Sequence, residues 1–174
     1  MNGPPPVVIA PYDPAWPAMF ESERALIARV LAPWAEGPIE HIGSTSAPGL
    51  PAKPIIDIMG GVRDLASSRP AIEALKALSY CYFEYKADVM HWFCKPSDQL
   101  RTHHLHLVPY GSLVWRERIA FRGRLRADAT LREAYCALKL RLAAEFRDDR
   151  EAYTEAKSDF IAAALAQNTP GPMR

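Results

Sequence analysis

Two short apolar segments, joined by a loop of small residues and prolines, constrain the fold of this chain most strongly. Residues 39–42 predict a strand that runs into Gly43 and Ser44, and residues 54–59 predict a second strand. The second strand contains one carboxylate, Asp57. A charged side chain in an apolar strand is costly unless it is paired, hydrogen-bonded or bound to a metal. The pattern therefore places Asp57 at a site.

The turn that precedes this carboxylate has a chemistry of its own. Backbone N–H groups of a Gly-Ser turn are well suited to holding phosphate oxygens, and Thr45 follows Gly43 and Ser44 directly. A phosphate-binding turn beside a strand carboxylate is the minimum set of groups for handling a nucleotide with a divalent cation. The alternative is that Ser44 and Thr45 are turn residues that bond their own backbone.

This stretch resembles the signature of the GrpB (UPF0157) family, which belongs to the nucleotidyltransferase superfamily with the DNA polymerase β-like fold. That signature places a Gly-Gly or Gly-Ser pair before a spacer, an Asp, an apolar residue and a second acidic residue. Here a twelve-residue spacer separates Ser44 from Asp57. Further blocks in the family's order lie at 11–17, 103–108 and 121–126, so the resemblance covers nearly the whole chain.

The resemblance implies one domain over residues 1–174 with an α+β fold: a nucleotidyltransferase-like mixed β-sheet, flanked by helices, with a C-terminal helical segment. We expect residues 1–6 and 167–174 to be flexible. Apolar spacing predicts, besides the two strands above, an edge strand at 7–9, a helix at 16–34, a helix at 71–78, a hairpin at 80–85 and 89–95, a strand at 103–108, and helices with apolar stripes over 131–146 and 153–165.

The chain departs from the superfamily at the second acidic position, which falls on Met59. A thioether does not bind a hard cation such as Mg²⁺. The resemblance therefore implies the fold and a nucleotide site, and leaves the transfer reaction open.

Histidines offer a replacement for the missing carboxylates. Alternation along the strand places His104 and His106 on one face, where two imidazoles can bind a metal, donate to phosphate or move a proton. We expect Asp57, His104 and His106 to form the catalytic and metal-binding group, with Mg²⁺, Mn²⁺ or Zn²⁺ as the metal. His41, just before the Gly-Ser turn, is expected to line the same cleft.

Basic residues supply candidates for phosphate contact, together with Gly43, Ser44 and Thr45. Lys53 precedes the Asp57 strand and offers either a point charge to phosphate or an ordinary solvated amine. Arg118, Arg122 and Arg126 are spaced four apart, so they share one helix face, which is usually a solvated one. Because Arg122 and Arg126 match the family's Phe-Arg block, the resemblance favours their reaching the cleft.

Composition limits the partners. The net charge of +1, with 49% hydrophobic and 24% charged residues, is ordinary for a soluble protein and gives no general basis for binding nucleic acid. The three cysteines lack CxxC spacing and are expected to be thiols in a reducing cytoplasm. No segment resembles a signal peptide or a membrane span, so we expect no membrane partner.

Three functions are compatible with these residues. The leading hypothesis is an enzyme that binds a nucleoside triphosphate and transfers a nucleotidyl group to a small molecule or protein. The second is a non-catalytic nucleotide- or phosphate-binding module, which Met59 favours, whereas the two histidines favour retained chemistry. The third is a ligase- or cyclase-type activity on the same fold.

Overall fold

The computed structural model of the chain describes residues 5–167, so the ends expected to be flexible lie almost entirely outside the described residues. The elements in chain order are α1 (Trp16–Leu31), β1 (Ala35–Ile42), the 3-10 turn η1 (Ser44–Ser46), β2 (Ile56–Val62), α2 (Ala71–Ala74), the 3-10 turn η2 (Leu75–Leu78), β3 (Cys81–Phe83), β4 (His91–Pro96), β5 (Arg101–Pro109), α3 (Leu113–Ala127), α4 (Ala129–Glu145), α5 (Arg150–Glu155) and α6 (Ser158–Ala166).

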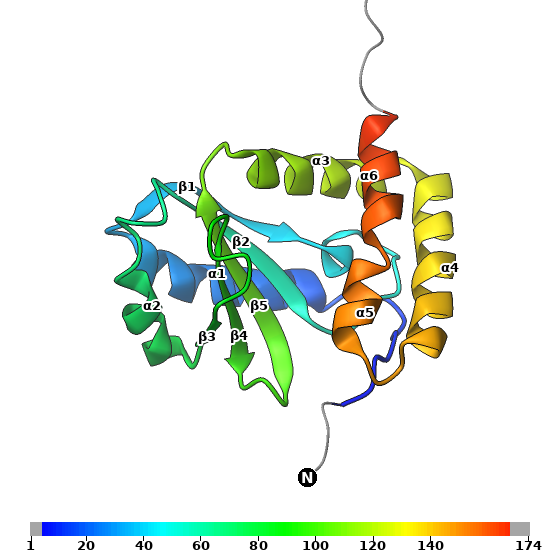
Figure 1. Cartoon of the computed structure of the whole chain (residues 1–174), viewed down its shortest axis with the longest axis horizontal. Coiled ribbons are helices and arrows are strands. Elements are labelled where there is room, and N and C mark those ends of the chain that lie inside the picture. Colours follow the sequence, from blue (N-terminus) through cyan, green and yellow to red (C-terminus); the bar gives the residue numbers. More distant parts are fainter. Residues whose placement is uncertain (1–4, 168–174) are drawn as a thin grey trace, which may run out of the picture.

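The strands form one mixed sheet in the order β1-β2-β5-β4-β3. β2 and β5 are parallel, and every other neighbouring pair is antiparallel. In Figure 1, α1 lies behind the sheet, α3 runs along its upper edge, and α4, α5 and α6 stand together at one side. This is the α+β fold with a C-terminal helical segment that the resemblance implies.

The main core lies between α1 and the sheet. Trp16, Phe20, Ile27 and Leu31 recur at helical spacing on one face of α1 and are buried, together with inward-facing residues of β2, β4 and β5. Near 25 cal/mol per Å² of apolar surface, burial of this kind is the main stabilising term of such a fold. This packing covers one face of the sheet with α1 and leaves the opposite face available for the site.

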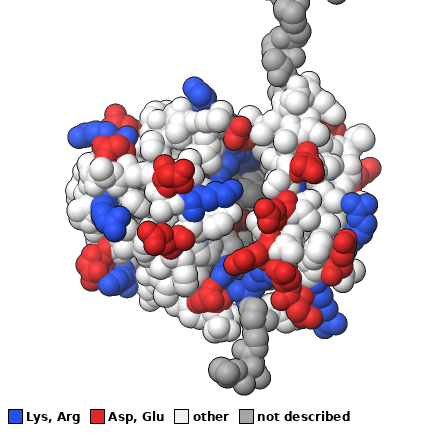
Figure 2. All heavy atoms as spheres, in the orientation of Figure 1, with Lys and Arg blue, Asp and Glu red and all other residues white. Residues whose placement is uncertain are grey.

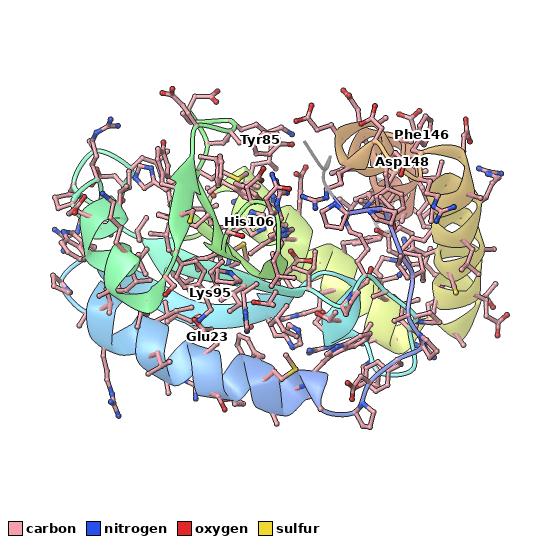
Figure 3. The ribbon with its side chains drawn as sticks, turned by 90° about the horizontal axis from the view of Figure 1, so that it is seen from below. Glu23, Tyr85, Lys95, His106, Phe146 and Asp148 are labelled. Atoms are coloured by element: carbon pink, nitrogen blue, oxygen red, sulfur yellow. The ribbon has the colours of Figure 1, made fainter. Side chains whose placement is uncertain are left out.

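A buried ion pair also ties α1 to the sheet on this covered face. Lys95 Nζ of β4 lies 2.6 Å from Glu23 Oε1 of α1, and the Tyr80 hydroxyl donates to the same oxygen at 3.0 Å. Figure 3 shows Glu23 and Lys95 together on the α1 side, with His106 farther from that helix. Removing one partner alone would leave the other buried and uncompensated.

The C-terminal helices begin where polar side chains cap them. Ser112 Oγ accepts from Trp115 N–H at the start of α3, Asp128 accepts from Leu131 N–H at the start of α4, and Asp149 accepts from two N–H groups at the start of α5. The caps at Asp128 and Asp149 mark where one helix ends and the next begins. No helix in residues 5–167 is both long and apolar enough to cross a membrane.

Two expectations from the sequence were wrong. Residues 7–9 form no strand, because Val7 N–H bonds to Arg147 O at 2.7 Å and the only sheet-like contact nearby is the bridge between Ala10 and Ala52. The last helix is two helices, α5 and α6. Their apolar side chains pack in different clusters, Tyr153 with Val7 and Leu142, and the α6 residues with α3 and α4.

Candidate functional site

The Gly-Ser turn approaches Asp57 directly. Gly43 has φ 70° and ψ −173°, and a Cβ added there would lie 2.5 Å from Asp57 Oδ2. Only glycine combines that conformation with so close an approach. The turn is then closed by Ser46, whose backbone N–H and hydroxyl both donate to Gly43 O, at 3.2 and 2.6 Å. The loop thus holds its first residues against the carboxylate.

Asp57, His104 and His106 lie on two neighbouring strands of the face not covered by α1. Asp57 of β2 is the register partner of His104 of β5. His104 Nδ1 lies 2.9 Å from Asp57 Oδ1, and His106 Nε2 lies 3.8 Å from the same oxygen. The structure therefore brings the three expected residues together, which we call the Asp-His-His group.

The group is partly open to solvent. The Asp57 side chain keeps 29% of its surface exposed, against 13% for His104 and 9% for His106. Figure 2 shows a hollow between the part of the molecule formed by the sheet and the part formed by α5 and α6, with basic side chains in it and acidic ones along its rim. Asp57 is therefore the most accessible of the three side chains.

Electrostatics separate the protonation states of the group. Burial alone would raise the pKa of Asp57, but the hydrogen bond with His104 and the nearness of His106 outweigh it and hold that pKa well below its usual range. Burial lowers the pKa of His106 to about 3, and the charge of Arg118 adds to this effect. Near neutral pH the group therefore combines a carboxylate with at least one neutral imidazole.

The group also fits a metal ion. One ligand atom from each of the three side chains lies within 4.8 Å of the others. The nitrogens that face Asp57 Oδ1 are His104 Nδ1 and His106 Nε2, at 2.9 and 3.8 Å, whereas in the described residues the opposite nitrogens, His104 Nε2 and His106 Nδ1, are buried without a hydrogen-bond partner. A donor set of one oxygen and two nitrogens suits Mn²⁺ or Zn²⁺ better than Mg²⁺, which prefers oxygen ligands.

The position where the resemblance expects a second acidic residue is closed to solvent in this chain. Met59 lies on the same sheet face as Asp57 but is fully buried in an apolar cluster with Ile42, Val108 and Trp115. A carboxylate there would be held under α3, away from water. The chemistry at this site consequently depends on the histidines of β5.

Three lysines lie where the loop before β2 meets the C-terminal helices, and two of them were missed by sequence reasoning. Lys53 and Lys157 lie over the Tyr153 ring, at 4.9 and 4.1 Å from its centre. The buried Lys139 lies 5.0 Å from the centre of the Tyr135 ring and donates to Pro51 O. We call these three residues the lysine group.

The lysine group is poorly solvated and crowded. Burial lowers the pKa of Lys157 to about 7, with further lowering by Lys53 and Lys139, whereas the charge of Asp57 raises it. Burial likewise lowers the pKa of Lys139 to about 8. Burial also lowers the pKa of Lys53. In residues 5–167 none of these amines forms an ion pair with a carboxylate, so their protonated forms carry charge that no neighbouring carboxylate balances.

Arg122 and Arg126 hold the loop in place. Arg122 Nη1 donates to Glu40 Oε2 at 2.6 Å and to His41 O at 2.9 Å. Arg126 Nε donates to Ser46 O at 3.0 Å. Both guanidiniums thus already have partners next to the Gly-Ser turn, and direct phosphate contact from them stays a prediction.

His41 does not line the cleft as expected. It is the register partner of Ile58, so it points to the α1 side, where its ring stacks on Phe20 at 4.8 Å. Its Nε2 lies 2.9 Å from the Thr45 hydroxyl, which also donates to Ile55 O at 3.3 Å. Any phosphate contact from Thr45 therefore falls to its backbone N–H.

Comparisons with known proteins agree with this fold. The sequence profile of the family described as GrpB protein matches residues 6–167. A Pseudomonas aeruginosa relative, UPF0157 protein PA4798, is 35% identical over 166 residues, covering 92% of this chain and 67% of the relative. The crystal structure of conserved protein GrpB from Enterococcus faecalis is 30% identical with a TM-score of 0.82, over 92% of this chain and 96% of that one.

The fold is also similar, at low sequence identity, to that of a poly(U) polymerase. The Cid1 poly(U) polymerase with Mg and 3'-dATP bound has a TM-score of 0.53 and 14% identity, covering 85% of this chain and 49% of that chain. At that identity the likeness shows the fold alone. The mixed sheet and its helices are thus similar to nucleotidyltransferase-like folds.

Proposed function

The chain belongs to the GrpB family, and from its site we propose that it is an enzyme that binds a nucleoside triphosphate and transfers a nucleotidyl group to a small molecule or a protein. The observation that carries the proposal is the Asp-His-His group, which lies against the Gly-Ser turn and faces the lysine group. A carboxylate, a phosphate-binding turn and several buried amines at one place match the charge pattern of a bound nucleoside triphosphate.

Each part of the site has a role in this proposal. Backbone N–H groups at Ser44 and Thr45 hold phosphate oxygens, and the lysine group neutralises the β- and γ-phosphates. Asp57, His104 and His106 are the residues that would hold a divalent metal. Such an ion supplies charge neutralisation at the phosphate under attack.

The reaction needs positioning more than covalent chemistry. An acceptor oxygen attacks the α-phosphorus, the bond from the α-phosphorus to the bridging oxygen breaks, and pyrophosphate leaves with that oxygen. The acceptor's proton needs a base. His104, which Asp57 orients through Nδ1, would take it where the imidazole does not hold the metal.

A non-catalytic nucleotide-binding module is the second candidate, and the burial of Met59 favours it. A ligase- or cyclase-type activity would begin with the same attack at the α-phosphorus and differ in the product. Pyrophosphate release separates the binding module from the transfer reaction and the ligase- or cyclase-type activity. The identity of the labelled product separates transfer from cyclisation.

We would test the proposal by thermal unfolding with ATP, GTP, CTP and UTP, each with Mg²⁺, Mn²⁺, Zn²⁺ or no metal. A bound triphosphate at a hundred times its Kd stabilises by about 2.7 kcal/mol. For a chain of this length that corresponds to a rise in Tm of roughly 5–10 °C. The rise should be largest with Mn²⁺ or Zn²⁺ and should be followed by transfer of an α-labelled phosphate.

Two variants give this experiment its control. Lys157→Gln should remove most of the shift in Tm, because it takes one amine from the polyphosphate site. Lys76→Gln removes an exposed lysine that pairs with Glu73 and should leave the shift unchanged. No shift with any nucleotide, or the same loss in both variants, would contradict the proposal.

A further inference from the structure

Two of the three cysteines face each other at the edge of the sheet. Cys81 of β3 and Cys94 of β4, both free thiols, are register partners in an antiparallel pair of strands that lie side by side in Figure 1. Partners of this kind have Cα atoms about 4.5–5.5 Å apart, inside the range of about 4.4–6.8 Å that a disulfide spans. The backbone therefore already holds the two residues at the separation that a disulfide needs.

The side chains of this pair also share one face of the sheet. Register partners point to the same face, and the next pair on that face, Phe83 with Trp92, has ring centres 5.7 Å apart. Cys81 Sγ lies 3.6 Å from Pro96 O, on the strand that carries Cys94. The Cys81 side chain thus leans over β4, and rotation about its Cα–Cβ bond moves its sulfur toward that of Cys94.

The two thiols differ in exposure, which sets the order in which they react. Cys81 is half-buried, whereas Cys94 is fully buried. An oxidant from solvent therefore meets Cys81 first, and Cys94 is the neighbouring thiol that resolves the product. Cys136, the remaining cysteine, packs in the cluster formed by α3, α4 and α6 and takes no part in the sheet.

We propose that Cys81 and Cys94 form a reversible oxidation site, which takes a small disulfide such as oxidised glutathione as its oxidant and locks the edge strand β3 onto the sheet. β3 pairs with β4 through three residues, of which Cys81 is the first. A covalent bond at the end of so short a ladder holds it closed. Cys94 is in turn the register partner of His104, so the bond forms on the face that carries the Asp-His-His group. This oxidation needs neither a nucleotide nor a metal, so it is independent of the proposed function.

The exchange balances over two steps. The Cys81 thiolate attacks one sulfur of the small disulfide, whose S–S bond breaks, and one molecule of the small thiol leaves. The Cys94 thiol then gives its proton to water, and its sulfur attacks Cys81 Sγ. The bond between Cys81 and the small molecule breaks, and the second small thiol leaves. The two cysteines lose two electrons in total, and the small disulfide gains them.

The test measures this equilibrium on the intact protein. The native protein is equilibrated with mixtures of reduced and oxidised glutathione and quenched in acid, and its remaining thiols are alkylated. Because the chain has three cysteines, the reduced form takes up three alkyl groups and the form with an internal disulfide takes up one. Peptide mapping identifies the bond, and the same measurement in urea gives the constant for the unfolded chain. We expect the native constant for the bond between Cys81 and Cys94 to exceed the unfolded one at least ten-fold, because the strand register already holds the residues together.

Variants and hydrogen exchange complete the test. Cys136→Ser is the matched control and should leave the native constant unchanged, whereas Cys81→Ser should form no internal disulfide. Amide hydrogen exchange over residues 81–85 should slow at least five-fold in the oxidised parent and should not change in Cys81→Ser after the same treatment. Equal native and unfolded constants, a native disulfide that uses Cys136, or unchanged exchange in the oxidised parent would overturn the proposal.

Discussion

Gly43→Ala is the substitution for which the structure gives the clearest expected loss. The φ of 70° and ψ of −173° at Gly43 cost any other residue about 1–3 kcal/mol. The added Cβ would also lie 2.5 Å from Asp57 Oδ2 and 3.0 Å from Asp57 Cβ, so the carboxylate has to move. We expect the free energy of unfolding to fall by about 2–4 kcal/mol, since crowding adds to the backbone cost. Binding that depends on Asp57 should fall at least ten-fold.

Gly49→Ala provides the matched control in the same loop. Gly49 also has a positive φ, 78°, but nothing lies within 4 Å of an added Cβ. The Gly49→Ala variant should therefore lose about 1–2 kcal/mol of stability and keep the binding that depends on Asp57. Urea denaturation measures the first quantity, and calorimetric titration of Mn²⁺ with ATP measures the second. If both variants lose binding equally, strain in the loop explains the loss and the contact between Gly43 and Asp57 does not.

Three further predictions concern charges. Burial lowers the pKa of His41 from 6.5 to about 4, so the unfolded chain takes up the proton first as the pH falls. Between pH 6.5 and pH 4, each pH unit of acidification should therefore reduce the free energy of unfolding by up to about 1.4 kcal/mol through His41. Chemical denaturation across this range should give a shallower slope in His41→Gln, and an unchanged slope would refute the assignment. Glu23→Ala should lower the free energy of unfolding, measured by urea denaturation, by about 3–5 kcal/mol because Lys95 is left unpaired. Adding Lys95→Met should restore most of this stability, and an equal loss in the double variant would contradict the reasoning. Since a bound phosphate raises the pKa of Lys157 from about 7, tripolyphosphate binding at pH 8 should take up protons and weaken as the pH rises; calorimetry in two buffers should show less uptake in Lys157→Gln, and equal uptake would remove Lys157 from the site.

The meeting of Asp57 with the histidines could be predicted because it depends on local patterns. Alternation fixes which residues of a strand share a face, and a single carboxylate in an apolar strand marks the face that carries a site. The parallel pairing of β2 with β5 then places Asp57 beside His104. Only the sharing of a face follows from a period of two residues, which the sequence displays directly, whereas the pairing of β2 with β5 follows from the fold that the resemblance implies.

His41 was assigned to the wrong face because register is not local. Because His41 is close in sequence to the Gly-Ser turn, it was expected to line the cleft. The antiparallel pairing of β1 with β2 instead places Ile42 opposite Asp57. A shift of one residue reverses every side chain of a strand. The stacking of His41 on Phe20 of α1 agrees with this register.

Arg118, Lys139 and Lys157 were not selected because their roles depend on how helices pack. The arginines of α3 share one face, yet each turn advances about 5–6 Å along the axis. Arg122 and Arg126 therefore reach the β1 end and the loop, whereas the charge of Asp57 acts on the pKa of Arg118. Lys139 and Lys157 come from α4 and the α5–α6 junction, and no local pattern specifies that these return to the sheet.

The central claim is that Asp57 binds a nucleoside triphosphate together with a divalent metal, and calorimetric titration of a non-hydrolysable ATP analogue tests it most directly. The titration is carried out with and without Mn²⁺ on the parent protein and on Asp57→Asn, which keeps the shape of the side chain and removes its charge. The account predicts that Mn²⁺ tightens binding to the parent at least ten-fold and has little effect on the variant, with both proteins folded. Equal tightening by Mn²⁺ in the two proteins, or no binding of the analogue to the parent, would contradict it.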